Sequence, residues 1–270
     1  MRNIPVWLLH LSDLHLFSDE SGELYGVNTA RTFEQALKRG LADLPGPLHA
    51  ILVTGDVADD GRRETYERFA ATMSVAGVPV VCCPGNHEEL AAMSSSLDTA
   101  PLQYCGSMDV AGWRIVALSS HVSGADWGSL AAAELDLLDR QLAGAPDRHA
   151  LVCLHHQPVE VGSPWLDAVG LRNADEFERV LGRHRNVRCV LFGHVHQESD
   201  QSRAGVRYLS APSTCAQFTP RTTSCVMDLR PPGFRWLRLD PQGTIETAVV
   251  WLDGLRRMER PPDSRREVAV

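Results

Sequence analysis

Apolar, β-branched runs recur along the chain and predict a series of strands. They span residues 4–12, 49–56, 78–86, 113–120, 149–156, 187–193, 206–211, 233–240 and 244–252. Between several of these runs, apolar residues recur every three to four positions, which predicts helices near 33–44, 66–73, 130–138 and 177–181. Thr29, Asp60 and Ser129 are candidate caps near three of the helix starts. The alternation of strands and helices indicates an α/β protein whose last third turns to strands and loops.

The length of 270 residues suits one large α/β domain or two small ones. We expect one domain over residues 1–255, because no internal repeat or linker divides that stretch. Residues 256–270 are rich in charge and contain Pro261-Pro262, so we expect them to form a flexible extension.

The charge balance and the apolar segments narrow the class of partner and the compartment. A formal net charge of −8 argues against a nucleic-acid polymer or an anionic membrane surface as partner. The apolar stretch after Met1 is interrupted by His10, too early for a signal peptide, and no later run is long enough to span a membrane. The seven cysteines include no C-x-x-C pair, and several lie inside apolar runs. Reduced thiols and a cytoplasmic location are therefore expected.

Metal-binding residue types gather where the predicted strands end. The five segments are Asp13-x-His15, Gly55-Asp56, Gly85-Asn86-His87-Glu88, His155-His156-x-Pro158 and Gly193-His194-x-His196. Carboxylate, amide and imidazole groups are suitable ligands for divalent metals. Five such segments in one chain favour a two-metal hydrolase site.

The spacing within these segments suggests how two ions are shared. Asp13 and His15 are two residues apart on an extended strand end, so both side chains leave the same face. His194 and His196 repeat that spacing, and one could serve each ion. Two ions roughly 3.5–4 Å apart need a carboxylate between them, and Asp56 is the natural bridge.

The order of the motifs is similar to that of the calcineurin-like metallophosphoesterases. In this chain it reads D-x-H, GD-x-x-D, GNH-E, HH-x-P and GH-x-H over residues 13–196. The stretches 23–29 and 211–218 resemble the bacterial class III cyclic-nucleotide phosphodiesterases, in particular those that act on cyclic AMP, and extend the resemblance over residues 6–252. It implies a four-layer α-β-β-α sandwich, with two mixed sheets flanked by helices, as the catalytic domain.

The resemblance also implies a role for each motif residue. One metal would be held by Asp13, His15, Asp56 and His196. The other would be held by Asp56, Asn86, His156 and His194. His87 would be the catalytic histidine that binds no metal, oriented by the carboxylate of Asp59, and Asn86 and His87 would contact the substrate.

Several of these roles have alternatives. Strand alternation sends only one of two adjacent histidines to the site, and the His-x-Pro spacing selects His156, which leaves His155 packed behind the ligands. His87 could be a general acid or could position the phosphate. Asp59 and Asp60 could both be helix caps.

Other polar residues lack a motif that assigns them a role. His10, His49, His121, His149 and His184 are expected in the core or on the surface. Arg172-Asn173 could touch the substrate, or Asn173 could begin a helix. At Ser119-Ser120-His121 the chain departs from relatives that often have an Asp, so no role is carried over to that loop.

The expected reaction is hydrolysis of 3′,5′-cyclic AMP to 5′-AMP by a metal-bridging hydroxide, without a covalent enzyme intermediate. Iron and manganese are the expected metals, with zinc or cobalt as alternatives, and the chain would act as a monomer or homodimer on a small-molecule substrate. The alternatives are a related enzyme for glycerophosphodiesters, lipid-linked diphosphates or phosphomonoesters, and a non-catalytic scaffold. The filled ligand positions disfavour the scaffold. A P-loop and a Gly-x-Ser-x-Gly elbow are both absent from the sequence.

Overall fold

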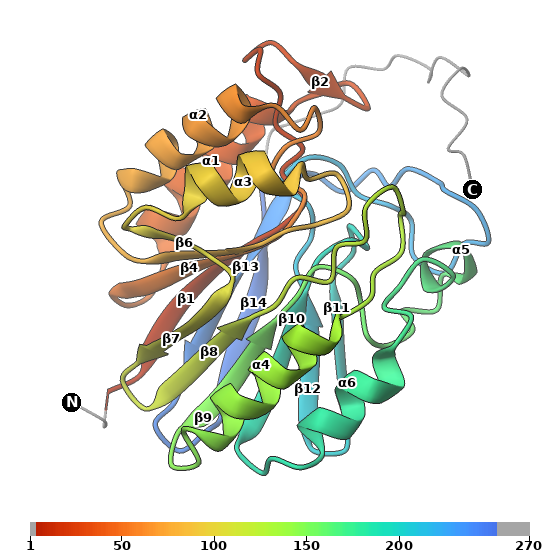
Figure 1. Ribbon diagram of the computed structural model, residues 1–270. Coiled ribbons are helices and arrows are strands. Elements are labelled where there is room, and N and C mark those ends of the chain that lie inside the picture. The colour runs from red at the N-terminus through yellow and green to blue at the C-terminus, as the bar shows by residue number, and fades with distance from the viewer. Residues whose placement is uncertain (1–3, 253–270) are drawn as a thin grey trace.

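Two six-stranded mixed sheets form the centre of the molecule in the computed structural model, which describes residues 4–252 (Figure 1). The first sheet has the order β14-β13-β1-β4-β5-β6. Its strands are β1 (Val6–Leu11), β4 (Leu48–Thr54), β5 (Val80–Cys83), β6 (Leu102–Tyr104), β13 (Gly233–Leu239) and β14 (Ile245–Trp251). The second sheet has the order β11-β12-β10-β9-β8-β7. Its strands are β7 (Gly106–Val110), β8 (Trp113–Ala117), β9 (His149–Cys153), β10 (Val187–Phe192), β11 (Ser199–Arg203) and β12 (Val206–Ser210).

Helices cover the outer face of each sheet, as Figure 1 shows. The first sheet is covered by α1 (Thr29–Asp43), α2 (Arg63–Ser74) and α3 (Leu90–Leu97), and the second by α4 (Ala132–Ala143), α5 (Pro164–Asp167) and α6 (Ala174–Leu181). A small hairpin of β2 (Glu23–Leu24) and β3 (Val27–Asn28) precedes α1.

Successive residues of the central strands face different layers, because side chains alternate along a strand. In β1, Leu8 packs between the two sheets while Leu9 packs under the helices of the first sheet. In β10, Leu191 packs between the sheets while Val190 packs under the helices of the second sheet. Both faces of each sheet are therefore buried, and the predicted four-layer α-β-β-α sandwich is confirmed.

The parallel strands bring distant motifs together. β1 pairs in parallel with β4, and β4 with β5, so these three strands end at one edge of the first sheet. β8, β9, β10 and β12 are parallel in the second sheet. The loops that follow the carboxyl ends of such strands are where binding sites of open α/β sheets lie.

The nine predicted strands are present, but several further elements were not predicted. β7 and β11 are edge strands with sequences Gly-Ser-Met-Asp-Val and Ser-Asp-Gln-Ser-Arg, which lack the apolar signal of a buried strand. β6 and the short helices α3 and α5 were also missed. Edge strands with so few apolar residues are detectable only from their pairing, which the sequence does not show.

The predicted helix caps were wrong in detail. Asn28, not Thr29, caps α1, and its side chain accepts a hydrogen bond from the Arg31 N–H. The side chain of Asp60 accepts a bond from the Arg62 N–H just before α2. Ala131, not Ser129, is the N-cap residue that precedes α4, and its side chain makes no capping hydrogen bond.

The expected flexible extension at 256–270, and with it the domain boundary at 255, lies outside the described residues. Between residues 4 and 252, none of the helices combines the length and apolar character that crossing a membrane requires.

Candidate metal centre

The five predicted segments converge at the carboxyl ends of five strands. Asp13 and His15 follow β1, Asp56 follows β4, Asn86 follows β5, His156 follows β9, and His194 and His196 follow β10. The loops hydrogen-bond to one another through their backbones: the Asp13 N–H donates to the Gly55 carbonyl, and the His15 N–H to the Asp56 carbonyl. The Asp13 carboxylate in turn accepts a bond from the His194 N–H at 3.0 Å, which ties the two sheets together.

Five of the predicted ligands have a left-handed backbone, which is rare for residues other than glycine. They are Asp13, His15, Asp56, His194 and His196, with φ between 47° and 68°. Such a conformation costs on the order of 1–3 kcal/mol per residue and persists only where the surroundings fix it. Its concentration at the candidate ligands indicates that these loops are shaped for a function.

The first cluster consists of Asp13, His15 and His196, all buried. The Nε2 atoms of His15 and His196 lie 3.1 Å apart, and the His196 Nε2 lies 3.4 Å from the Asp13 carboxylate. The outer nitrogens are held by other groups: the His196 Nδ1 donates to the Ala216 carbonyl, and the His15 Nδ1 lies 3.2 Å from the Asp59 carboxylate. With those protons on Nδ1, both Nε2 atoms present lone pairs to each other.

The two facing lone pairs lie beside the Asp13 carboxylate, and neither Nε2 atom then has a proton donor. A cation at their centre would satisfy all of them, and hydrogen bonding of the outer ring nitrogen to a carboxylate or carbonyl is the usual arrangement of a metal-binding histidine. The donor set of the first cluster therefore fits a divalent metal ion.

The second cluster consists of His155, His156 and His194. The Nε2 atoms of His156 and His194 are buried and have no hydrogen-bond partner among the described residues. The His156 Nδ1 is held by the Ser120 hydroxyl at 2.8 Å. Because an unpaired buried nitrogen costs free energy, two of them side by side also fit a missing cation.

The expectation that only one of the adjacent histidines faces the site was wrong. His155 Nδ1 donates to the Thr54 carbonyl at 2.7 Å, which turns its Nε2 toward Asp56 and Asn86. That Nε2 lies 3.4 Å from Asp56 Oδ2 and 3.2 Å from Asn86 Oδ1. The chain leaves regular strand geometry after Cys153, so strand alternation no longer separates the two rings.

Asp56 lies between the clusters, as expected for a bridging residue. Its Oδ2 is 3.8 Å from the His15 Nε2 and 3.4 Å from the His155 Nε2, and its Oδ1 accepts a bond from the His87 N–H. Burial would raise the pKa of the Asp56 carboxyl, but the imidazoles of His155 and His87 outweigh it and hold the pKa well below its ordinary value. Burial likewise opposes protonation of His155, yet the Asp56 carboxylate raises the pKa of His155 to about 9. The site thus favours positive charge beside its carboxylates.

His87 lies at the open side of the clusters, with a side chain that is 39% exposed. Its Nδ1 is 3.4 Å from Asp59 Oδ1. Burial would lower the pKa of His87, but the Asp56 and Asp59 carboxylates raise it. The ring is therefore placed to carry a proton next to the candidate metal ligands while remaining accessible.

Glu88 is a residue whose role the sequence did not indicate. Its buried carboxylate accepts hydrogen bonds from the N–H groups of Asp56, Val57, Ala58 and Gly85. These bonds join the loop after β4 to the loop after β5, which carry Asp56 and Asn86. The one signal in the sequence is an acidic residue directly after Asn86-His87, and the four backbone donors become visible only in three dimensions.

Close packing at the site requires glycine at two predicted positions. A Cβ atom on Gly85 would run into the Asp56 carboxylate, and one on Gly193 into the Ser12 hydroxyl. The backbone approaches its neighbours closely at both positions, which only a residue without a Cβ atom allows.

Of the five histidines without a motif, two lie near the clusters and three do not. His121 Nδ1 contacts the Gly85 carbonyl at 2.8 Å, so the loop at 119–121 does border the site. His10 is fully buried beneath it and contacts the Thr54 hydroxyl. His49, His149 and His184 contact Trp7, Pro241 and Asp139 away from the clusters.

Asn173 is the N-cap residue of α6, but its side chain makes no hydrogen bond to the N–H groups of the helix. The side chain instead accepts a bond from the Leu130 N–H and donates one to the Leu130 carbonyl. Arg172 lies over the Trp127 ring, with its guanidinium carbon 3.5 Å from the ring centre.

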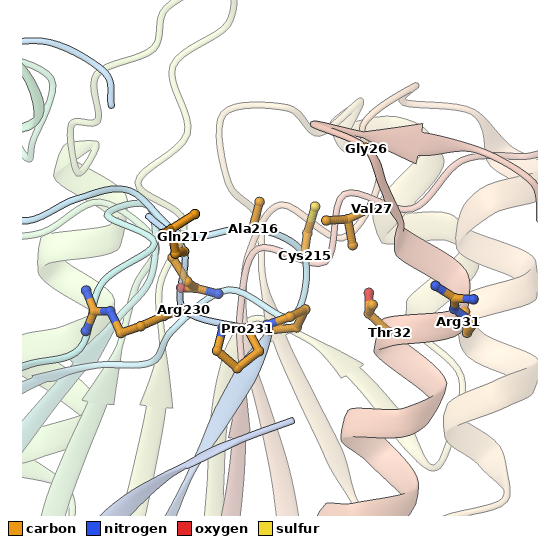
Figure 2. Close-up of a pocket in the computed structure, with 11 residues that line it drawn as sticks. Gly26, Val27, Arg31, Thr32, Cys215, Ala216, Gln217, Arg230 and Pro231 are labelled. Atoms are coloured by element: carbon orange, nitrogen blue, oxygen red, sulfur yellow. The ribbon is translucent and has the colours of Figure 1, made fainter. Parts of the chain in front are cut away.

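A small pocket lies beside the segment that contacts the candidate ligand His196 (Figure 2). Figure 2 shows Cys215, Ala216 and Gln217 on one side of it and Val27 and Thr32 on the other. None of the candidate ligands lines it, so it is separate from the clusters. It shares one wall with them, because the Ala216 carbonyl accepts the bond from His196.

Comparison with known proteins agrees with this geometry. The calcineurin-like phosphoesterase family matches residues 6–198. The chain is 39% identical over 248 residues to the 3′,5′-cyclic adenosine monophosphate phosphodiesterase CpdA of Pseudomonas aeruginosa, covering 92% of this chain and 90% of that protein. It is 36% identical to a 3′,5′-cyclic-nucleotide phosphodiesterase of a Nostoc species, covering 92% and 93%.

A solved structure, a dimetal phosphatase from Danio rerio, has the same fold. The TM-score is 0.63 at 16% identity, and the match covers 91% of this chain and 98% of that one. The match to most of the chain, the shared fold and the motif order lead to one conclusion: this chain belongs to the calcineurin-like phosphoesterase family.

Proposed function

We propose that this protein is a two-metal phosphodiesterase that hydrolyses 3′,5′-cyclic AMP to 5′-AMP. The observation that carries the proposal is the convergence of bare imidazole nitrogens and carboxylates, with the His15 and His196 Nε2 atoms 3.1 Å apart. The printed names of relatives at 36–39% identity over most of the chain support a cyclic-nucleotide substrate.

The residues divide into two ligand sets around Asp56. Asp13, His15, Asp56 and His196 would hold one ion. Asp56, Asn86, His156 and His194 would hold the other, and the position of His155 between Asp56 and Asn86 makes it a further candidate ligand. Bound divalent ions would supply Lewis acidity to the phosphate and lower the pKa of a coordinated water.

The donors are imidazole, carboxylate and amide groups, which suit iron or manganese and also zinc or cobalt. We propose iron or manganese. None of the seven cysteines belongs to the clusters found among the described residues, and all seven are free thiols. Reduced thiols support the cytoplasmic location expected from the sequence.

The protein's own groups would act on the leaving side of the phosphate. The 3′-oxygen of the ribose is a poor leaving group, and it needs a proton as its bond to phosphorus breaks. His87 is exposed, its pKa is raised by Asp56 and Asp59, and it lies beside Asn86. His87 would deliver that proton from Nε2, while its Nδ1 faces Asp59, and the Asn86 amide would contact the phosphate.

A substrate panel tests the proposal. The purified protein, loaded with Mn²⁺ or Fe²⁺, is assayed with cyclic AMP, cyclic GMP, a glycerophosphodiester, a lipid-linked diphosphate and a phosphomonoester. We expect kcat/KM for cyclic AMP to exceed the values for the last three, and the product to be 5′-AMP. Preference for another class, or release of 3′-AMP, would contradict the proposal.

A further inference from the structure

The pocket of Figure 2 is lined largely by apolar side chains. Its walls include Val27, Ala216, Leu229, Pro231 and Pro232. Leu229 is 90% exposed, so a large apolar side chain stands open to water in the wall of the pocket. A hollow with apolar walls and an uncovered leucine gains free energy when an apolar group fills it.

The last strand of the first sheet ends against this pocket. β14 ends at Trp251, and the N–H of the next residue, Leu252, donates to the Pro232 carbonyl at 2.8 Å. The guanidinium carbon of Arg230 lies 5.2 Å from the centre of the Trp251 ring. Arg230 and Pro232 both line the pocket. The chain therefore leaves the described part of the molecule in contact with the pocket wall.

The sequence that follows Leu252 supplies an apolar side chain within reach. It reads Asp253-Gly254-Leu255-Arg256-Arg257-Met258. An Asp-Gly pair favours a turn, so the chain can reverse its direction directly after Leu252. Leu255 is three residues beyond Leu252, which is at most about 10 Å along an extended chain. Leu255 is thus the first apolar residue after the strand, and it is close enough to enter the pocket.

We propose that the C-terminal segment 253–258 folds back over this pocket, with the Leu255 side chain inside it against Leu229 and Ala216. Burial of the leucine and of the pocket walls supplies the driving force. The occupant is part of the same chain and is attached at the rim, so its effective concentration at the pocket is high. This docking does not depend on the reaction that the protein catalyses.

The docked segment would also restrain the candidate ligand His196. Ala216 belongs to the pocket wall, and its carbonyl accepts the hydrogen bond from the His196 Nδ1 at 2.8 Å. Phe218, two residues further on, stacks on the His196 imidazole with ring centres 4.5 Å apart. Contacts of this kind set the orientation of a ligand histidine. Leu255 is therefore a positioning residue for the first cluster, a consequence that rests on the proposed function.

Disulfide trapping tests the docking without metal or substrate. Leu229→Cys is combined with Leu255→Cys in the full chain, together with Cys225→Ser because Cys225 is exposed. In the matched control, Val268→Cys takes the place of Leu255→Cys. A disulfide needs Cα atoms within about 7 Å, so under mild oxidation the first pair should close an intramolecular bond roughly tenfold or more faster than the control pair.

Leu255→Asp tests what the docking does to the first cluster. A charge cannot enter an apolar pocket, so the melting temperature should fall by roughly 5 °C. The affinity for the first Mn²⁺ equivalent, measured by isothermal titration, should fall by roughly tenfold. Val268→Asp is the matched control and should keep both wild-type values. Leu255→Met, which conserves the volume and the apolar character, should also keep both.

Two results would overturn the docking. One is an equal rate of disulfide formation in the two cysteine pairs, and the other is a disulfide between two chains, which would assign the pocket to a second copy. Wild-type Mn²⁺ affinity in Leu255→Asp would overturn the link to His196. Failure of the proposed function looks different: the wild type would not turn over cyclic AMP, while the trapping rates would stay as expected.

Discussion

The Oδ1 atom of Asp59 lies 3.2 Å from Nδ1 of His15. The same oxygen is 3.4 Å from Nδ1 of His87, and the His15 and His87 rings meet edge to face with centroids 4.8 Å apart. One carboxylate oxygen therefore orients both a candidate metal ligand and the candidate acid. In the proposed function Asp59 therefore serves both metal binding and proton delivery, which is more than the role carried over to it by resemblance.

Asp59→Asn tests this shared role. The amide keeps the size of the side chain but removes the charge that fixes both imidazoles, so affinity for the first metal equivalent should fall by roughly 10–100-fold. Cyclic AMP turnover should fall as well. Isothermal titration with Mn²⁺ measures the affinity, and His87→Ala is the control, expected to bind Mn²⁺ as the wild type does. Unchanged Mn²⁺ affinity in Asp59→Asn would show that Asp59 serves His87 alone.

Glu88→Gln tests the carboxylate that joins two ligand loops. Hydrogen bonds to a charged acceptor are worth more than neutral ones, so the loss should be on the order of 3 kcal/mol in the free energy of unfolding. Thermal unfolding should then begin roughly 5–10 °C lower. Glu89→Gln, at the next position and exposed, is the matched control and should leave the melting temperature unchanged. Equal melting temperatures for both variants would show that the Glu88 carboxylate does not stabilise the two loops that it joins.

His155→Ala and His156→Ala test which of the two adjacent histidines binds metal. The sequence selected His156 alone, whereas the distances in the structure make His155 a further candidate. The geometry places the His155 Nε2 against Asp56 and Asn86, so His155→Ala should weaken binding of the second Mn²⁺ by roughly tenfold or more. His156→Ala should do the same, and Asp56→Ala should weaken both sites and lower turnover by on the order of 10³-fold. His184→Ala, which removes a largely buried imidazole that contacts Asp139 away from the clusters, is the control. Wild-type metal binding in His155→Ala would restore the view that His155 only packs behind the ligands.

His87→Ala tests proton delivery. The ribose 3′-oxygen needs a proton to leave, whereas p-nitrophenolate leaves without one. At saturating Mn²⁺, the variant should lose roughly 10²-fold more kcat on cyclic AMP than on bis-p-nitrophenyl phosphate. Equal losses on the two substrates would assign His87 to positioning of the phosphate.

The sequence predicted those parts of the molecule that depend on local pattern. Apolar runs located the buried strands, and the motifs at their ends, such as Asp13-x-His15, located the candidate ligands. Polar edge strands such as Ser199–Arg203 escaped prediction because their pairing carries no apolar signal.

Contacts between distant segments also escaped prediction. The bonds from Glu88 to four backbone N–H groups, and the bond between Ser120 and His156, join residues that only the fold brings together. His155 was assigned by strand alternation, which fails once the strand has ended at Cys153. The sequence therefore indicated the candidate groups, and the structure showed which contacts hold them in place.

Metal dependence of cyclic AMP hydrolysis tests the central claim most directly. The protein is stripped by prolonged dialysis against a chelator, and Mn²⁺ is then added in steps while metal content and 5′-AMP formation are measured together. We expect no turnover in the stripped protein and full recovery as about two equivalents of Mn²⁺ bind. Full turnover of cyclic AMP in excess chelator, with no metal in the protein, would contradict the account.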